Sequence, residues 1–368
     1  MDESYIDEHY KFLIENEERI RTDEGMVRKI LASHLSHVPQ KLYKYRTCNR
    51  QNFKALKDGQ IYMPSANDFK DPFDYTLNFD LSKQTYEIAK FFKDNLAQIV
   101  FVGMQDILKQ KRIIAPKFTL KDVQFIIDNY FSKDGTCLEE KFEREILSNG
   151  NYADRVLYKK SKEFISDFKK DNEAKIYEIA EDMAQKINEV SRRPRTQSLV
   201  YCMTEDNASG PMWENYADGY SGFCVEYDLS TWQEKPFDEI KNLIYLLPII
   251  YLDEKPIFNM EPFFESAVKE SVFGEKLDKN ISLQIDLNKQ LLRKQKDYDY
   301  EREWRFAIKN EGNNLQPFSF VSAIYMGKDI SETNKKHLKV TAKKLKIPLH
   351  QQKLNYFGSK LRFEEIEI

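Results

Sequence analysis

Hydrophobic and polar positions alternate in several short segments, a pattern typical of half-buried β-strands. The clearest segments are 41–46, 60–63, 198–203, 222–228, 243–252, 303–308 and 323–327. Apolar residues recur at helical spacing through 4–34, 278–296 and 331–345 instead. Helices and strands do not alternate regularly along the chain. The pattern therefore predicts an α+β fold rather than a doubly wound sheet.

A long middle segment differs from its surroundings. Residues 84–190 are rich in Lys, Glu, Asp, Phe and Ile at helical spacing, and they contain few Gly or Pro residues. This composition predicts a mostly helical insertion. The predicted order is an N-terminal helical segment (1–40), the first part of a core (41–83), the insertion (84–195) and the rest of the core (196–368).

Composition narrows the class of protein. Hydrophobic residues make up 41% and charged residues 32%, as in ordinary globular proteins. The net charge of −3 argues against a surface that is wholly adapted to nucleic acid. No apolar run is long enough to cross a bilayer, so no membrane partner is expected. The four cysteines are scattered, which fits a reducing, cytoplasmic compartment.

The segment Tyr300-Glu-Arg-Glu-Trp-Arg-Phe306 is the strongest candidate for chemistry. In a strand, Glu301, Glu303 and Arg305 would share one face. Two carboxylates so close together repel each other unless a ligand uses them or a cation neutralises them. The alternative is an exposed charge ladder in which Arg305 neutralises Glu303.

Aromatic and basic residues supply further candidates. In Tyr43-Lys-Tyr-Arg46, the cations at the end of a short strand could hold phosphates, or Lys44 could simply protect a sheet edge. Trp213 and Tyr216 lie three residues apart on a predicted helix, where they could pack in the core or wall a slot for a flat ring. Segment 65–74 is rich in aspartate, which is common in turns, so its composition predicts a turn rather than a metal site. Phosphate-binding glycine loops, serine-hydrolase elbows and zinc-protease motifs are missing from the sequence.

Five motifs occur in an order that resembles a bacterial family of unknown function, domain-of-unknown-function family 2971. They are Tyr43-Lys-Tyr-Arg46, Asn67-Asp-Phe-Lys-Asp-Pro-Phe-Asp74, Met212-Trp-Glu-Asn-Tyr-Ala217, Gly222-Phe-Cys-Val-Glu226 and Tyr300-Glu-Arg-Glu-Trp-Arg305. The resemblance runs from about residue 41 to the C-terminus, apart from 84–190. The family name implies no activity.

The order of elements also resembles the NAD-binding core of ADP-ribosyltransferases, and Glu301-Arg-Glu303 resembles a catalytic signature of one branch. This second resemblance implies a split-sheet core with a helical insertion and NAD as the substrate. It implies transfer of ADP-ribose to a protein or nucleic-acid acceptor, or NAD hydrolysis, in a defence or toxin role. The implied catalytic residues are Glu303 and Glu301, and the implied NAD-binding residues are Tyr45, Arg46, Tyr201, Trp213 and Tyr216.

Two other functions stay open at this point. One is a metal-dependent nuclease or phosphodiesterase that uses Asp71, Asp74, Glu226 and Asp228. The other is a non-enzymatic sensor or adaptor in which segment 84–190 binds a partner.

Overall fold

The computed structural model of the chain describes residues 3–95, 120–121, 172–259, 281–355 and 360–367. The chain divides into two compact units. The first consists of Met1–Asn78, Arg192–Pro256 and Ile285–Ile368, and the second of Phe79–Ser191 and Ile257–Gln284. Helices and sheet are both present without regular alternation, which confirms the predicted α+β class.

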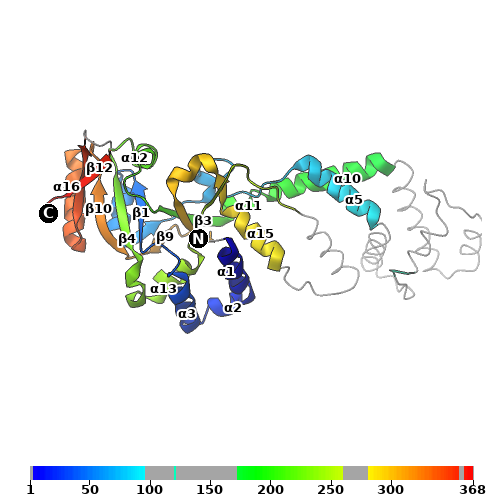
Figure 1. Cartoon of the computed structure of the whole chain (residues 1–368), viewed down its shortest axis with the longest axis horizontal. Helices are drawn as coiled ribbons and strands as arrows, with labels where there is room; N and C mark the ends of the chain where they lie inside the picture. Colours follow the sequence, from blue (N-terminus) through cyan, green and yellow to red (C-terminus); the bar gives the residue numbers. More distant parts are fainter. Residues whose placement is uncertain (1–2, 96–119, 122–171, 260–280, 356–359, 368) are drawn as a thin grey trace, which may run out of the picture. The chain divides into compact units, whose positions relative to one another are not determined.

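An eight-stranded mixed sheet forms the centre of the first unit (Figure 1). Its strands lie in the order β12 (Lys360–Glu365), β11 (Leu349–Asn355), β10 (Val321–Met326), β4 (Phe223–Asp228), β1 (Lys41–Arg46), β3 (Ser198–Thr204), β8 (Glu303–Lys309) and β5 (Leu247–Pro248). Within this sheet β10 and β11 are parallel, and the other neighbours are antiparallel. The predicted strands 41–46, 198–203, 222–228 and 303–308 thus belong to one sheet.

Strand β1 pairs very differently with its two neighbours. It pairs with β4 along its whole length, from Lys41 to Arg46. Its ladder with β3 is limited to Tyr43 opposite Thr204, although β3 pairs with β8 at all of its residues. The sheet therefore opens between β1 and β3 beyond that single pair.

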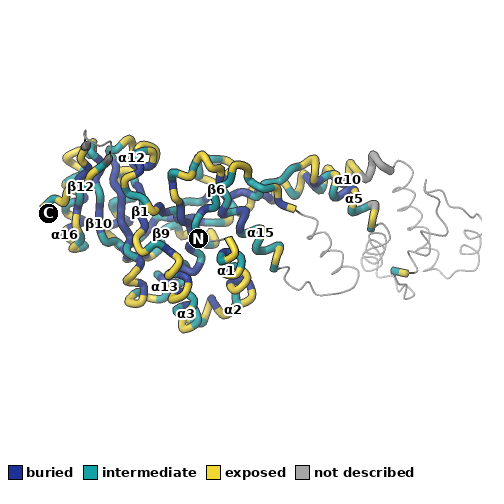
Figure 2. Tube along the Cα trace, in the orientation of Figure 1, coloured by how far each residue is buried: buried dark blue, intermediate teal, exposed yellow. Residues whose placement is uncertain are grey.

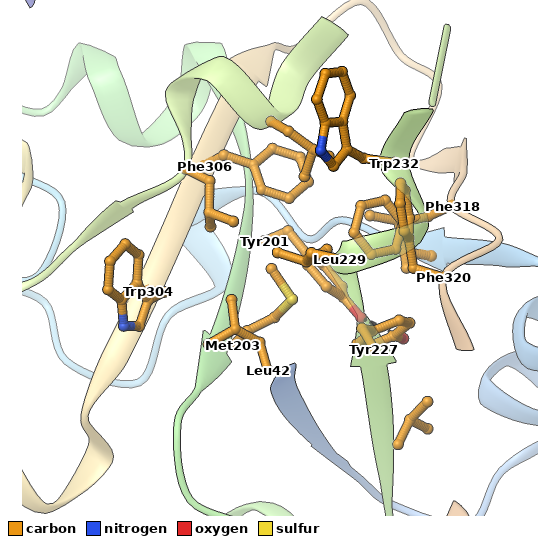
Figure 3. Packing of buried hydrophobic residues seen from close by; sticks show 14 of the residues in the cluster. Leu42, Tyr201, Met203, Tyr227, Leu229, Trp232, Trp304, Phe306, Phe318 and Phe320 are labelled. Carbon is orange, nitrogen blue, oxygen red and sulfur yellow. Dashed lines mark hydrogen bonds between the residues drawn. The ribbon is translucent and has the colours of Figure 1, made fainter. Parts of the chain in front are cut away.

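One face of the sheet carries the main hydrophobic core. Leu42 of β1, Tyr201 of β3 and Phe306 of β8 pack there with Phe318 and Phe320 (Figure 3). Figure 2 shows that the central strands are buried along most of their length. This face is covered by α3 (Glu24–His34), α4 (Arg50–Lys57), α13 (Phe237–Ile240) and α16 (Glu332–Leu345), with the small sheet of β2 (Gln60–Tyr62) and β9 (Leu315–Pro317).

Short elements cover the opposite face. Tyr45 and Cys224 of the sheet pack there against Met212 and Trp213. The covering elements are α12 (Gly210–Tyr216), η1 (Ala66–Asp68), η4 (Lys296–Glu301) and the parallel pair β6 (Ile250–Leu252) and β7 (Arg293–Gln295). The other described elements that lie in this unit, wholly or in part, are α1 (Glu3–Glu15), α2 (Glu17–Ile20), α11 (Arg193–Gln197), α15 (Ile281–Leu291), η2 (Leu229–Glu234) and η3 (Lys241–Tyr245).

The N-terminal segment 4–34 is not the single helix that its periodicity predicts. It forms α1, α2 and α3, with a break at Asn16 and another before Asp23. The carboxylate of Asp23 accepts a hydrogen bond from the backbone N–H of Met26, so it starts a new helix. Short polar side chains favour such capping positions over helix interiors, and this preference overrides the apolar periodicity.

The described part of the second unit is helical. Helices α5 (Leu81–Asp94) and α10 (Asn172–Val190) pack through Ile88, Ala89, Ala180 and Ala184. Most of the predicted insertion 84–195 falls in this unit, and its residues 96–119 and 122–171 lie outside the described part. Among the helices that the structure describes, none has the length and apolar character of a membrane span.

Candidate functional site

A cavity of about 690 Å³ lies in the first unit where β1 and β3 part. Its volume suits a small-molecule ligand. Strands β1, β3 and β8, helix α12, η4, the β7 region and the loop after β2 all contribute to its wall. The lining residues are Tyr43, Lys44, Tyr45, Pro64, Asp68, Phe69, Lys70, Asp71, Pro72, Phe73, Asp74, Val200, Cys202, Met203, Thr204, Met212, Asn215, Tyr216, Lys294, Gln295, Tyr298, Tyr300, Glu301 and Glu303.

A network of buried charges forms one wall of this cavity. Arg305 donates to Asp74 through two hydrogen bonds of 2.9 and 3.1 Å, and its Nε donates to Glu303 at 2.9 Å. The ammonium of Lys294 lies 2.5 Å from Glu301 Oε2 and 3.4 Å from Glu303 Oε2. It also lies 3.5 Å from Asp74 Oδ2. Three carboxylates therefore share two cations, which leaves one net negative charge on the wall.

This network corrects the picture of an exposed charge ladder. Glu303 is only 6% exposed and Arg305 only 1%, so their ion pair is buried. The cation between Glu301 and Glu303 is Lys294 rather than Arg305 alone. Buried charges are tolerated because each has a partner of opposite sign within hydrogen-bonding distance.

The two glutamates have pKa values shifted in opposite directions. Burial alone would raise the pKa of Glu303, but the charges of Arg305 and Lys294 outweigh it and lower that pKa. Burial and the nearby charge of Glu303 raise the pKa of Glu301, and Lys294 only partly opposes them. Such a pair combines one firmly ionised carboxylate with one that exchanges its proton more readily.

Glu301 does not belong to the strand in which its sequence pattern placed it. It ends the 3₁₀-helix η4, and Arg302 follows in the left-handed conformation with φ of 42°. Strand β8 therefore begins at Glu303. The Tyr216 hydroxyl donates to Glu301 Oε1 at 2.7 Å, and 39% of Tyr216 is exposed. Tyr216 is one of the residues that line the cavity.

Strand β1 contributes Tyr45 and Lys44 to the cavity. The Tyr45 hydroxyl donates to the Asp206 carbonyl at 2.8 Å, and its ring meets Trp213 edge to face. Tyr45 lines the cavity but is largely buried. Lys44 is half-buried, and its ammonium lies 5.2 Å from the centroid of the Tyr201 ring. Burial lowers the pKa of Lys44 to about 8.

Three residues expected to hold a ligand, Arg46, Tyr201 and Trp213, are not among those that line this cavity. Arg46 donates to the hydroxyl of Tyr201 at 3.2 Å, and Tyr201 is fully buried in the main core (Figure 3). Trp213 is also fully buried, and its indole N–H donates to the Asn207 carbonyl. Large aromatic rings gain most from complete burial, which explains why these two rings fill the core.

The four acids of the nuclease alternative are not gathered at one place. Asp71 and Asp74 line the cavity, but Glu226 and Asp228 do not. Glu226 accepts hydrogen bonds from Lys41, Ser322 and Tyr325, and Asp228 caps η2. Within the described residues no cluster of three or more His, Cys, Asp or Glu side chains could hold a metal ion.

Lys294 is the site residue that the sequence pattern did not reveal. It precedes Glu301 by seven residues and comes from β7, outside every motif. The sequence holds only a weak signal for it: two glutamates two residues apart repel each other, so a cation besides Arg305 could be expected near them. Only the fold shows which of the many lysines supplies it.

Comparison with known proteins adds one match. Residues 212–306 match the model of a family described as "Protein of unknown function (DUF2971)". The match covers most of α12, all of β4 and the start of β8, and so includes Tyr216, Lys294, Glu301 and Glu303. It agrees with the family that the five motifs resemble. No curated protein and no solved structure matches the chain.

Proposed function

We propose that the cavity between β1 and β3 cleaves the bond between nicotinamide and ribose in NAD. The ADP-ribose is then transferred to water or to a protein or nucleic-acid acceptor. One observation carries this proposal. Glu301, Glu303, Tyr45 and Tyr216 come from four separate elements and line a single cavity at the place where the sheet opens. A sheet that opens beside the ligand cavity is also what the resemblance to an ADP-ribosyltransferase split-sheet core leads one to expect.

The charge balance of the wall suits this reaction. Loss of nicotinamide leaves positive charge on the ribose, as in glycoside hydrolysis. The wall carries one net negative charge, and the lowered pKa keeps Glu303 ionised at neutral pH. Because Arg305 and Lys294 fix this carboxylate in place, it needs little reorganisation as the positive charge develops.

The remaining groups fit the other steps. Tyr216 and Tyr298 offer aromatic rings at the cavity wall, against which a flat nicotinamide ring can stack. Glu301 accepts a hydrogen bond from Tyr216, and its raised pKa suits it to take a proton from the acceptor nucleophile. Arg46, Tyr201 and Trp213 do not line the cavity and have no part in this proposal.

Release of free nicotinamide from NAD by the purified protein tests this function. We expect Glu303→Gln to lower the rate about 10²- to 10³-fold, as for the loss of one preorganised charge that stabilises a transition state. Tyr216→Ala should lower the rate as well. Tyr216→Phe keeps the stacking ring, so it should lower the rate less than Tyr216→Ala does. Glu226→Gln is the matched control, because Glu226 is an equally buried strand carboxylate that does not line the cavity.

The outcome is decided by the contrast between these variants. Each variant is first compared with the wild type by tryptophan fluorescence, so that only folded proteins enter the assay. No nicotinamide release by the wild type, with or without protein and nucleic-acid acceptors, would refute the proposal. So would equal rates for Glu303→Gln and Glu226→Gln.

A further inference from the structure

One residue that lines the cavity carries a chemical group that the proposed reaction does not use, the amine of Lys44. It is the central cation of β1, and the residue lines the cavity beside Tyr43 and Tyr45. Two other lysines line the same cavity, Lys70 and Lys294. Lys294 is committed to three carboxylates, as described above.

The surroundings of the Lys44 amine are unlike those of Lys294. Within the part of the chain that the structure describes, it has no hydrogen bond and no ion pair. It lies over the face of Tyr201 at 5.2 Å, and the guanidinium of Arg46 lies over the same ring at 5.3 Å. A second cation thus sits close to an amine that has no counter-ion of its own.

The charges that act on this amine come from all sides of the gap between the strands. After burial, the charged groups with the largest influence on its pKa are Arg46 of β1, Glu303 and Glu301. The neighbouring Cys202 of β3 stays an uncharged thiol, because burial raises its pKa. Burial and Arg46 favour the uncharged amine, and the two glutamates favour the ammonium. Burial and Arg46 prevail, because the pKa is lowered to about 8. Desolvation combined with a neighbouring cation is one way in which proteins activate a lysine as a nucleophile.

We propose that the Lys44 amine is a nucleophile of the cavity that forms an imine with an uncharged aldehyde or ketone ligand. The amine lone pair attacks the carbonyl carbon and a C–N bond forms. The nitrogen then loses its protons, and the carbonyl oxygen leaves as water, so no oxidant or reductant takes part. The carboxyl group of Glu301 lines the same cavity and can carry the proton to the leaving oxygen. The net negative wall disfavours an anionic carbonyl compound.

This inference does not depend on NAD cleavage. A carbonyl compound tests it directly, and the proposed function can fail while Lys44 still reacts. The reverse also holds, since nicotinamide release does not require an imine. The two proposals are therefore separated by the probe that each experiment uses.

The test is reductive alkylation of the full-length wild-type protein with propanal and cyanoborohydride at low conversion. Cyanoborohydride reduces an imine to a stable secondary amine, and peptide mass spectrometry then reports how fast each lysine reacts. At pH 7 an amine with a pKa near 8 is uncharged roughly 200 times more often than one at the ordinary value of about 10.4. A less basic amine is also a weaker nucleophile, which offsets part of this gain. Lys44 should therefore react at least about tenfold faster than Lys336, which is exposed on α16.

The pH profile gives a second readout. The rate at Lys44 should level off above about pH 8, while the rate at an ordinary lysine keeps rising through pH 9. Lys294 is the matched control in the same cavity and should hardly react, because three carboxylates stabilise its ammonium. Lys44→Arg should abolish the rapidly alkylated peptide and leave the alkylation rates of the other lysines unchanged. Equal rates at Lys44 and Lys336, or a rate at Lys44 that still rises tenfold per pH unit above pH 9, would overturn the proposal.

Discussion

The buried charge network beside the cavity should make the stability of the protein depend strongly on Arg305. Arg305→Met removes the cation that holds both Asp74 and Glu303, and it leaves three buried carboxylates facing Lys294 alone. Removing one partner of a buried ion pair costs about 3–5 kcal/mol. Glu303→Gln instead leaves two carboxylates with two cations, and the glutamine oxygen can still accept a hydrogen bond. We expect that change to cost about 1–3 kcal/mol, the penalty of a disturbed buried polar group.

Urea unfolding followed by tryptophan fluorescence measures the difference. All three tryptophans, Trp213, Trp232 and Trp304, lie in the first unit, so the signal reports on the unit that holds the network. Lys309→Met is the control, since Lys309 is an exposed cation on the same strand and should change little. A free energy of unfolding for Arg305→Met that is no lower than that of Lys309→Met or of Glu303→Gln would contradict a stabilising role of the Arg305 charge.

Acid titration of the same variants provides an independent check. Despite their burial, the charge of Arg305 is the main cause that lowers the folded-state pKa values of Asp74 and Glu303. The stability that they contribute is therefore present above their unfolded pKa, near pH 4, and is lost as the pH falls toward the folded values. Wild-type stability should fall below about pH 4. In Arg305→Met this fall should be flatter, and an unchanged slope would contradict the assigned cause.

Three further outcomes follow from individual positions. Trp213→Ala should cost about 3–5 kcal/mol in urea unfolding, because the ring is fully buried, whereas Tyr216→Phe should cost about 1–3 kcal/mol, because it removes a hydrogen bond to the buried Glu301 carboxylate. Burial lowers the pKa of His9, and that of His34 to about 3, so stability should fall below about pH 6.5 by up to roughly 1.4 kcal/mol per pH unit for each group, and His34→Gln should lessen this slope. Gly327→Ala should lower the melting temperature, since an added Cβ would overlap a backbone carbonyl of the neighbouring turn.

Local patterns predicted the strands of the main sheet well, because the alternation of polar and apolar residues is a property of each segment, even though both faces of β4 and β8 are largely buried. The alternation in 41–46 and 303–308 identifies β1 and β8 from sequence alone. It does not tell which strands are neighbours. Strands β1 and β3 pair at one position only, and the cavity lies where they separate. This separation depends on how the whole sheet assembles from segments that are distant in sequence. The position of the cavity could therefore not be derived from the motifs.

The fate of individual side chains was harder to predict than the elements that carry them. Trp213 and Tyr216 lie on the same short helix, but one is fully buried and the other is 39% exposed. Three residues correspond to less than one full turn, so a small rotation of α12 decides which ring meets the core. In the same way, one left-handed residue, Arg302, moves Glu301 from the strand into η4 and brings it to Lys294. Sequence patterns carry no signal for such local choices.

The loop that closes the cavity shows how one feature serves both the fold and the site. A basic cluster at the end of a charged helical segment is usually solvated, yet Arg195 of the cluster 192–195 is buried. Its guanidinium donates to the backbone carbonyls of Phe69, Asp71 and Asp74. Arg305 holds the Asp74 side chain from the sheet. Two buried arginines thus fix a loop that has little regular structure of its own, and this fixation keeps the carboxylate of Asp74 within reach of Lys294. Asp74 therefore owes its position to arginines far away in the sequence, whereas the Asp71 carboxylate accepts a hydrogen bond from the backbone N–H of Phe73 and so follows the local turn chemistry.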